Sequence, residues 1–145
     1  HLVLTHAGDH VVTFSPSYDQ HAAIAESIGA EITVLPLAKE NRYLPDVEQL
    51  RAAARPDTKL ICLTNPNNPT GTMMDLAILR EVVKIARSVD AYILCDEVYR
   101  GVEAEDVLGV PSIVDFMRRD WQPAGCLRRF LCRGFVWVGL LLLRI

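Results

Sequence analysis

KLICLTNPNNPTG (residues 59–71) passes from a continuous apolar run into a loop with two Asn-Pro pairs and a glycine. An apolar run of this length, followed by turn residues, predicts a buried β-strand at 59–64. Asn-Pro pairs often start turns, and the glycine permits backbone conformations that other residues avoid. Pro66 and Pro69 also stiffen the loop, so the amide of Asn68 has little conformational freedom. The segment is either an ordinary turn or a rigid frame for a side-chain amide.

Strand and helix patterns alternate on both sides of this segment. Helical spacing of apolar residues predicts helices after Tyr18, Asp46 and Asp75, and apolar or β-branched runs predict strands at 10–14, 31–37, 59–64 and 91–97. The alternation predicts an α/β fold in three layers, a mostly parallel sheet with helices on both faces. Ligands bind beyond the carboxyl ends of the strands in such sheets. The segments 15–18, 65–71 and 96–101 are therefore expected to face one crevice.

Composition argues against several classes of partner. The chain has 145 residues, enough for one domain with a core, and a formal net charge of −3. This charge gives no reason to expect nucleic acid or a membrane surface as a partner. No signal-peptide pattern is found, and the expected location is the reducing cytoplasm.

The cysteines and histidines do not predict a metal site. No Cys-x-x-Cys pair is present, and Cys62 and Cys95 lie in apolar runs typical of buried thiols. No histidine has a partner at metal-ligand spacing, so surface or helix-face positions are expected for His1, His6, His10 and His21.

Asp96 and Tyr99 are candidate site residues because they follow the apolar run YILC. A carboxylate at the end of a buried strand is partly desolvated, which is costly unless it meets a cation or hydrogen-bond donors. The alternative is an aspartate that caps the next turn and a tyrosine at the surface. Neither residue alone decides between these interpretations.

Together, TNPNNPTG (64–71) and ILCDEVYRG (93–101) resemble the class I/II aminotransferases, pyridoxal-phosphate enzymes with the fold of aspartate aminotransferase. FSPSYDQH (14–21) and ENRYLPDVEQLRAA (40–53) are similar to family segments in the expected order. The resemblance covers about residues 2–117. It implies that the chain is part of the large, cofactor-binding domain of such an enzyme.

The resemblance also implies a role for four side chains. Asp96 matches the aspartate that pairs with the protonated pyridine nitrogen, and Asn68 and Tyr99 match the groups that bond the phenolate oxygen of pyridoxal 5′-phosphate. Tyr18 matches the aromatic residue that stacks on the ring. For Asn65 a turn role in a looser part of the loop is expected.

The residues beside the motif are expected to play no part in the chemistry. Glu97 and Arg100 flank Asp96 and Tyr99, and solvated ion pairs are the expected role for both. No catalytic residue is assigned among the 145 positions.

The family's Schiff-base lysine has no counterpart here. In the family it follows the aspartate by a few dozen residues, whereas the last lysine of this sequence is Lys84. Arg128 and Arg129 occupy the expected region, and a guanidinium does not deprotonate to act as nucleophile. The family's phosphate-binding turn would precede His1. We therefore expect a partial large domain at 1–117, truncated at both ends relative to the family.

Residues 118–145 form an atypical Arg/Leu-rich tail. Four arginines and no acidic residue give 121–145 a charge of +4, whereas 1–120 carry −7. The apolar run at 135–143 is too short to span a bilayer, which needs about 20 residues. It is either a buried strand or helix end, or the product of a shifted reading frame after about Met117.

The implied function is amino-group transfer between an amino acid and a 2-oxo acid in a biosynthetic process, by an enzyme that is a homodimer when complete. This chain is expected to be inactive because it lacks the lysine. Three alternatives stay open: a pyridoxal-phosphate lyase of the same fold, a non-catalytic remnant that binds a partner, and a nucleotide-binding domain. The last lacks a Gly-x-Gly-x-x-Gly motif after a strand.

Overall fold

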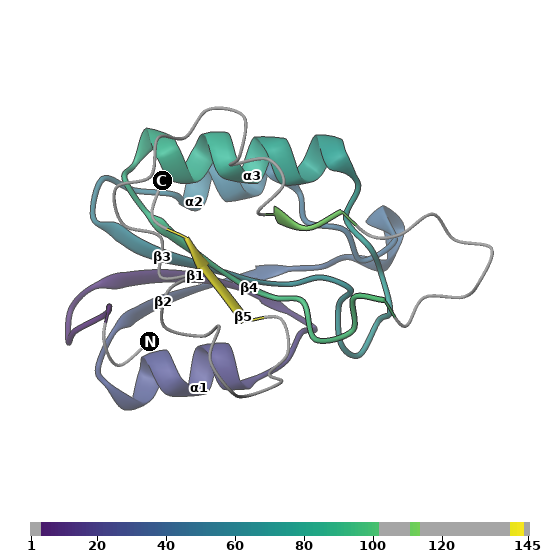
Figure 1. The fold of residues 1–145 in the computed structure, drawn as a ribbon. Coiled ribbons are helices and arrows are strands. Elements are labelled where there is room, and N and C mark those ends of the chain that lie inside the picture. Colours follow the sequence, from purple (N-terminus) through teal and green to yellow (C-terminus); the bar gives the residue numbers. More distant parts are fainter. Residues whose placement is uncertain (1–3, 102–110, 114–139, 144–145) are drawn as a thin grey trace, which may run out of the picture.

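The computed structural model describes residues 4–101, 111–113 and 140–143, and its centre is one β-sheet (Figure 1). Within these residues the strand order is β2-β1-β3-β4-β5. The first four strands are parallel and β5 is antiparallel to β4. Their bounds are His10–Ser15 (β1), Glu31–Pro36 (β2), Thr58–Thr64 (β3), Tyr92–Asp96 (β4) and Leu140–Leu143 (β5). The predicted strands and their parallel arrangement are confirmed.

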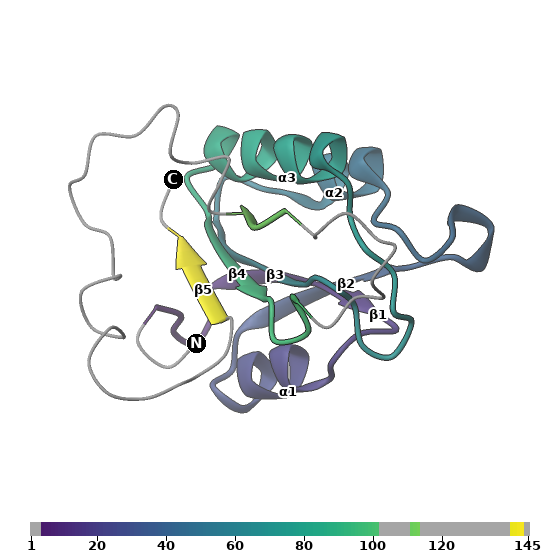
Figure 2. The ribbon, with the colours of Figure 1, turned by 45° about the vertical axis from the view of Figure 1, so that its right-hand side comes forward.

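Helices cover both faces of the sheet, as Figure 2 shows, so the predicted three layers are confirmed. One face carries α1 and the other carries α2 and α3. The helices are Gln20–Ser27 (α1), Val47–Ala53 (α2) and Leu76–Ser88 (α3), with a short 3₁₀ helix at Lys39–Asn41 (η1). Asp46 and Asp75 cap α2 and α3, each accepting two backbone N–H groups of the first turn.

The core has two parts because alternate side chains of a strand point to opposite faces. The larger part packs β1, β3 and β4 against α2 and α3, and includes Leu50, Ile61 and Leu79. The smaller part lies under α1 and includes Ala25 and Leu60. Leu76, the first residue of α3, has an exposed side chain.

Both cysteines of the described residues are buried thiols, as predicted. Burial raises the pKa of Cys62 and Cys95 well above the usual range for a thiol. Cys126 and Cys132 lie outside the described residues.

His10 is not a surface residue, contrary to the sequence-based expectation. Its side chain is fully buried, and its two ring nitrogens lie 2.7 Å from Thr58 Oγ1 and 2.8 Å from Thr33 Oγ1. It thus ties β1 to both neighbouring strands. Burial is the main cause of its lowered pKa, followed by the charge of Arg55. The residue pattern of HVVTF (10–14) predicted that His10 lies on a strand. It could not show that threonine hydroxyl groups of the two neighbouring strands hydrogen-bond to the His10 ring.

The predicted tail lies largely outside the described residues. Of residues 118–145, only Leu140–Leu143 is described, and this segment pairs with the β4 edge of the sheet. Among the described residues, no helix has the length and apolar character needed to cross a membrane.

Candidate functional site

The three loops predicted to share a crevice follow β1, β3 and β4. All three leave the sheet at the same end, where the carboxyl ends of these strands lie (Figure 1). Parallel pairing causes this, because the carboxyl ends of the three strands lie together. Thr64 and Asp96 are partners in the register of β3 and β4. The backbone N–H of Asn65 donates to the carbonyl of Asp96 at 2.8 Å. This bond fixes the first residue of the loop after β3 (the β3 loop) relative to the start of the loop after β4 (the β4 loop).

Asn68 and Tyr99 meet across these loops. The Asn68 Nδ2 donates to the Tyr99 hydroxyl at 3.2 Å, although the residues are 31 positions apart. Asn68 is half-buried and the Tyr99 side chain is exposed. A carboxamide and a phenol therefore converge where polar groups of a ligand could reach both.

Asp96 is the last residue of β4 and is half-buried. Within the part of the chain that the structure describes, the one hydrogen bond to its carboxylate is from the Val98 backbone N–H to Oδ1, at 3.0 Å. The second carboxylate oxygen, Oδ2, thus remains able to accept a donor from a ligand. The bond from Val98 is also the turn-capping contact of the alternative interpretation, so both roles are compatible with the geometry.

His21 is a site residue that the sequence analysis missed. It is on α1, is only 7% exposed, and its Nε2 lies 3.4 Å from Thr64 Oγ1. Burial lowers its pKa, and the negative charge of Asp96 partly opposes this effect. His21 lies on a helix face, one of the two positions expected for it, but this face is buried, because His21 and Ala25 are the buried residues of α1. Their spacing of four residues was the available signal.

Tyr18 lies beside His21 at the start of α1. The two rings meet edge to face, with centroids 6.4 Å apart and planes at 87°. The Tyr18 side chain is 41% exposed, so one part of its ring is available to another molecule.

Asn65 is a fixed part of its loop rather than a loose one, which corrects the expectation. Its side chain is fully buried, and its Oδ1 accepts from the Met74 backbone N–H at 2.9 Å. This bond closes the loop before α3 begins. Its Nδ2 is buried and has no hydrogen-bond partner in the described part of the chain.

Glu97 was predicted to be solvated, which is wrong because its side chain is buried. It is 5% exposed, and its Oε1 accepts from the Ile113 backbone N–H at 2.9 Å and from Ser112 Oγ at 3.2 Å. It therefore fastens residues 112–113 to the end of β4. Arg100 is exposed, as expected for a solvated cation.

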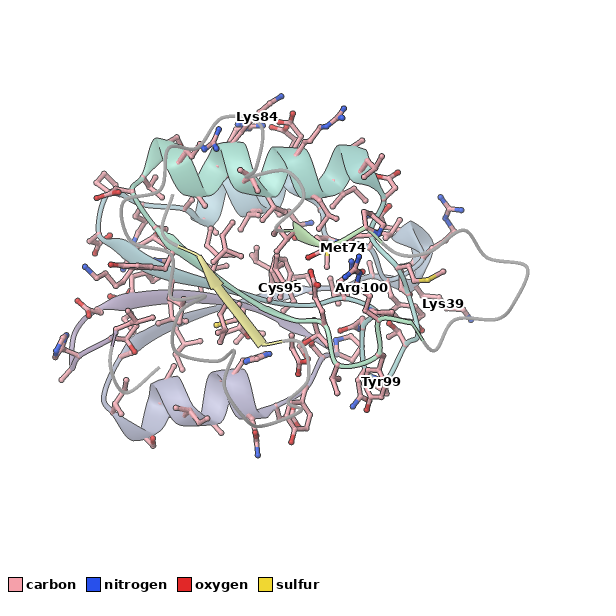
Figure 3. The ribbon with its side chains drawn as sticks, viewed as in Figure 1. Lys39, Met74, Lys84, Cys95, Tyr99 and Arg100 are labelled. Carbon is pink, nitrogen blue, oxygen red and sulfur yellow. The ribbon has the colours of Figure 1, made fainter. Side chains whose placement is uncertain are left out.

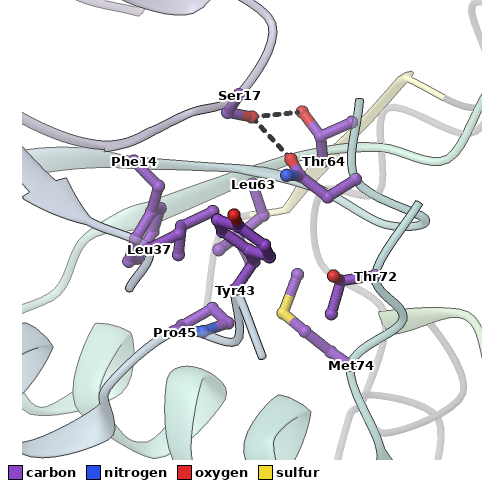
Figure 4. Close-up of a pocket in the computed structure, with 10 residues that line it drawn as sticks. Phe14, Ser17, Leu37, Tyr43, Pro45, Leu63, Thr64, Thr72 and Met74 are labelled. Carbon is purple, nitrogen blue, oxygen red and sulfur yellow. Dashed lines mark hydrogen bonds between the residues drawn. The ribbon is translucent and has the colours of Figure 1, made fainter. Parts of the chain in front are cut away.

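A small pocket lies under the loops, on the side of the sheet that carries α2 and α3 (Figure 4). Phe14, Leu63 and Met74 form part of its apolar wall. At its rim, Ser17 Oγ lies 3.2 Å from Thr64 Oγ1 and 2.8 Å from Asn67 Oδ1. The rim thus joins the β1 loop to the β3 loop.

Two of the three lysines lie away from the site loops, and the third, Lys39, is on η1. Lys84 pairs with Glu81 on the outer side of α3, away from Tyr99 (Figure 3). Lys59 lies over the ring of Tyr92 on β4, 5.8 Å from its centroid. Among the described residues, no group of three or more His, Cys, Asp or Glu side chains could hold a metal ion.

Comparison with known proteins gives a consistent result. The family described as "Aminotransferase class I and II" matches residues 2–135. Aspartate aminotransferase of Pyrococcus horikoshii is 34% identical over 110 residues, which are 76% of this chain and 28% of that protein. Aspartate aminotransferase of Musicola paradisiaca is 33% identical over 142 residues, 90% of this chain and 36% of that protein.

Solved structures agree with these relatives. A PLP-dependent aminotransferase from Streptococcus suis is 47% identical with a TM-score of 0.72, covering 79% of this chain and 30% of that one. An aspartate aminotransferase of Thermus thermophilus is 29% identical with a TM-score of 0.65, covering 67% of this chain and 25% of that one. The chain thus spans about a third or less of the length of these relatives.

Proposed function

Because the chain belongs to the aminotransferase class I and II family, we propose that the loops after β1, β3 and β4 form the ring-binding part of a pyridoxal 5′-phosphate site. The observation that carries this proposal is the 3.2 Å contact between the Asn68 amide and the Tyr99 phenol. Both groups have a further hydrogen to donate, and at this separation they can reach one acceptor oxygen. Such a donor pair fits the phenolate oxygen of the cofactor.

Asp96 is proposed to hold the proton of the pyridine nitrogen. When bound, the cofactor accepts the electron pair left on an amino acid that loses its α-proton, which requires that this nitrogen be protonated. Burial lowers the pKa of His21, so the imidazole next to Asp96 is neutral at pH 7 and does not cancel the carboxylate charge. The Asp96 charge therefore favours a cationic ring at this position.

Tyr18 is proposed to cover one face of the ring. Its edge rests against His21, which leaves the exposed part of the phenol for stacking. Family membership supports an amino acid and a 2-oxo acid as substrates of the complete protein. It also supports a homodimer and a biosynthetic role in the cytoplasm.

For the 145 residues themselves we propose binding without amino-group transfer. All three lysines precede Asp96 in the sequence, and neither Lys84 nor Lys59 lies among the site loops. Apart from the lysines, no side chain of this chain is suited to attach the cofactor through a nitrogen nucleophile.

The division at residue 117 is likewise a proposal. Residues 1–117 would belong to the large domain and 118–145 would be an atypical tail that arose by a frameshift. The test is the gene sequence after codon 117. In the family the Schiff-base lysine stands in a Ser-x-x-Lys-like stretch. Such a stretch in another frame would support the shift, and its absence from every frame would contradict it.

The site is tested with pyridoxamine 5′-phosphate, which has no aldehyde to react with surface lysines. The affinity of the full chain is measured by ligand fluorescence for the wild type, Asp96→Asn and Asp57→Asn. Loss of a charged hydrogen bond costs about 1.5–3 kcal/mol, so Asp96→Asn should weaken binding by about 10- to 150-fold. Asp57→Asn changes an exposed carboxylate outside the site loops and should bind as the wild type does. Equal affinities of the two variants would contradict the proposal.

The absence of covalent attachment needs its own measurement. The chain is incubated with pyridoxal 5′-phosphate, reduced with borohydride and analysed by peptide mass spectrometry. Scattered, substoichiometric labelling is expected. Stoichiometric labelling of one lysine that Asp96→Asn abolishes would show that the chain does attach the cofactor.

A further inference from the structure

Asn67 uses its whole side chain to join two loops. It is 7% exposed, and its Oδ1 accepts from Ser17 Oγ at 2.8 Å. Its Nδ2 donates to the Pro16 carbonyl at 3.0 Å and to Thr70 Oγ1 at 2.8 Å. Every hydrogen of this amide therefore has a partner, and two of its three contacts cross to the β1 loop.

The backbone of Asn67 is fixed as well. Its N–H donates to the Thr72 carbonyl at 2.8 Å, and its carbonyl accepts from the Gly71 N–H at 2.7 Å. These bonds close a tight turn within the β3 loop. The amide therefore projects from a rigid base, and it can hold another segment in place.

The segment that it holds leads directly to Tyr18. Pro16 and Ser17 lie between the end of β1 and the start of α1, where the backbone is neither strand nor helix. Figure 4 shows Ser17 above the pocket with Thr64 beside it, and the hydrogen bond from Ser17 Oγ to Asn67 Oδ1 holds Ser17 to the β3 loop. A hydroxyl has one proton, so Ser17 donates to the amide oxygen, and the Thr64 hydroxyl can donate to Ser17.

We propose that Asn67 is a positioning residue that fixes the 15–18 loop, and through it the ring of Tyr18, relative to the neighbouring Asn68. The role of the Tyr18 ring in holding the cofactor rests on the proposed function. The link between Asn67 and the position of Tyr18 does not, because it follows from the contacts of the amide alone.

Asparagine is required here for a chemical reason. An aspartate has the same shape and still accepts from Ser17, and the Thr70 hydroxyl can rotate to donate to it. The Pro16 carbonyl cannot donate a hydrogen bond. In Asn67→Asp a carboxylate oxygen therefore replaces Nδ2 and lies opposite the Pro16 carbonyl oxygen, and the two acceptors repel each other at a contact that is 3.0 Å in the wild type. The substitution thus breaks the link to Pro16 with little change of volume.

The first test needs no cofactor. The full chain is labelled with 3-fluorotyrosine and its ¹⁹F NMR signals are recorded, with the Tyr18 signal assigned by Tyr18→Phe. Asn67→Asp should shift or broaden the Tyr18 signal and leave that of Tyr92 unchanged. Thr58→Val is the control, because Thr58 is buried at the opposite end of the sheet, and it should not affect Tyr18. An unchanged Tyr18 signal in Asn67→Asp would overturn the proposal.

A double-mutant cycle with pyridoxamine 5′-phosphate asks whether the effect passes through Tyr18. Loss of one hydrogen bond with an unpaired acceptor predicts about a tenfold loss of affinity for Asn67→Asp, and less than about twofold in a Tyr18→Leu background. Equal losses in both backgrounds would overturn the proposal. If the wild type does not bind this ligand, the proposed function fails while the NMR experiment still decides the role of Asn67.

A second variant guards against misfolding. If Asn67→Asp is unfolded by circular dichroism, Asn67→Ser replaces it, because serine is too short to reach both Pro16 and Ser17. The same criteria apply: a changed Tyr18 signal supports the link, and an unchanged one refutes it.

Discussion

Glu97 provides a quantitative test of how the end of β4 is fastened. Its carboxylate is buried and accepts from the Ile113 N–H at 2.9 Å and from Ser112 Oγ at 3.2 Å. Glu97→Ala removes Oε1, the acceptor of both hydrogen bonds, and leaves the buried backbone N–H of Ile113 without this partner. Glu97→Gln is the matched control, because its amide oxygen can accept both hydrogen bonds in nearly the same volume.

The expected magnitude follows from the unpaired amide. Leaving a buried donor unsatisfied costs about 1–3 kcal/mol, which lowers the free energy of local opening by that amount. At about 1.4 kcal/mol per factor of ten, the Ile113 amide should exchange about 5- to 150-fold faster in Glu97→Ala than in the wild type. Glu97→Gln should show a smaller increase, because the new acceptor is neutral.

Hydrogen–deuterium exchange of the Ile113 amide, followed by NMR, measures this effect directly. The amide of Leu79, in the buried part of α3, reports on global stability in the same samples. Exchange of Ile113 at the wild-type rate in Glu97→Ala would refute the reasoning. So would an equal acceleration at Ile113 and Leu79, since that would indicate general destabilisation.

Three further predictions concern stability and reactivity. Burial lowers the pKa of His10, so its contribution to folding stability is complete above pH 6.5 and declines as the pH falls below that value. In urea unfolding at several pH values, the free energy of unfolding should therefore fall less steeply with decreasing pH for His10→Gln than for the wild type. An equally steep fall in both proteins would contradict this. Asp75→Ala should lower the free energy of unfolding by about 1 kcal/mol, because two N–H groups of α3 lose their acceptor, and an unchanged urea midpoint would argue against the cap. Cys62 and Cys95 should react slowly with iodoacetamide in the native protein, because burial raises the pKa of both thiols. Labelling is measured by peptide mass spectrometry, and rapid labelling of either cysteine in the native protein would refute its burial.

The local features of the fold could be predicted from the sequence because their causes are local. The apolar run at 59–64 requires a buried strand, and the aspartates at positions 46 and 75 precede helical apolar spacing. Alternation of strands and helices then implies a parallel sheet, and the parallel sheet places the loop of Asn68 beside that of Tyr99. Each step uses neighbours in the chain or a general rule of topology.

The polar residues behind the site could not be predicted in this way, because their partners are distant in sequence. His21 meets Thr64 across 43 positions and Asn67 meets Ser17 across 50. Glu97 meets Ile113 across 16. Their residue types are common at surfaces, so composition favours solvent-exposed roles. Only the packing of the loops over the strand ends shows that each is buried and bonded.

The central claim is that Asp96 keeps a proton on the ring nitrogen of the bound cofactor. It is tested most directly by ¹⁵N NMR of pyridoxamine 5′-phosphate labelled at that nitrogen, at a pH where the free ligand has lost the ring proton. The wild-type complex should give the chemical shift of a protonated nitrogen, and the Asp96→Ala complex that of an unprotonated one. An unprotonated nitrogen in the wild-type complex, or the same shift in both proteins, would contradict the claim.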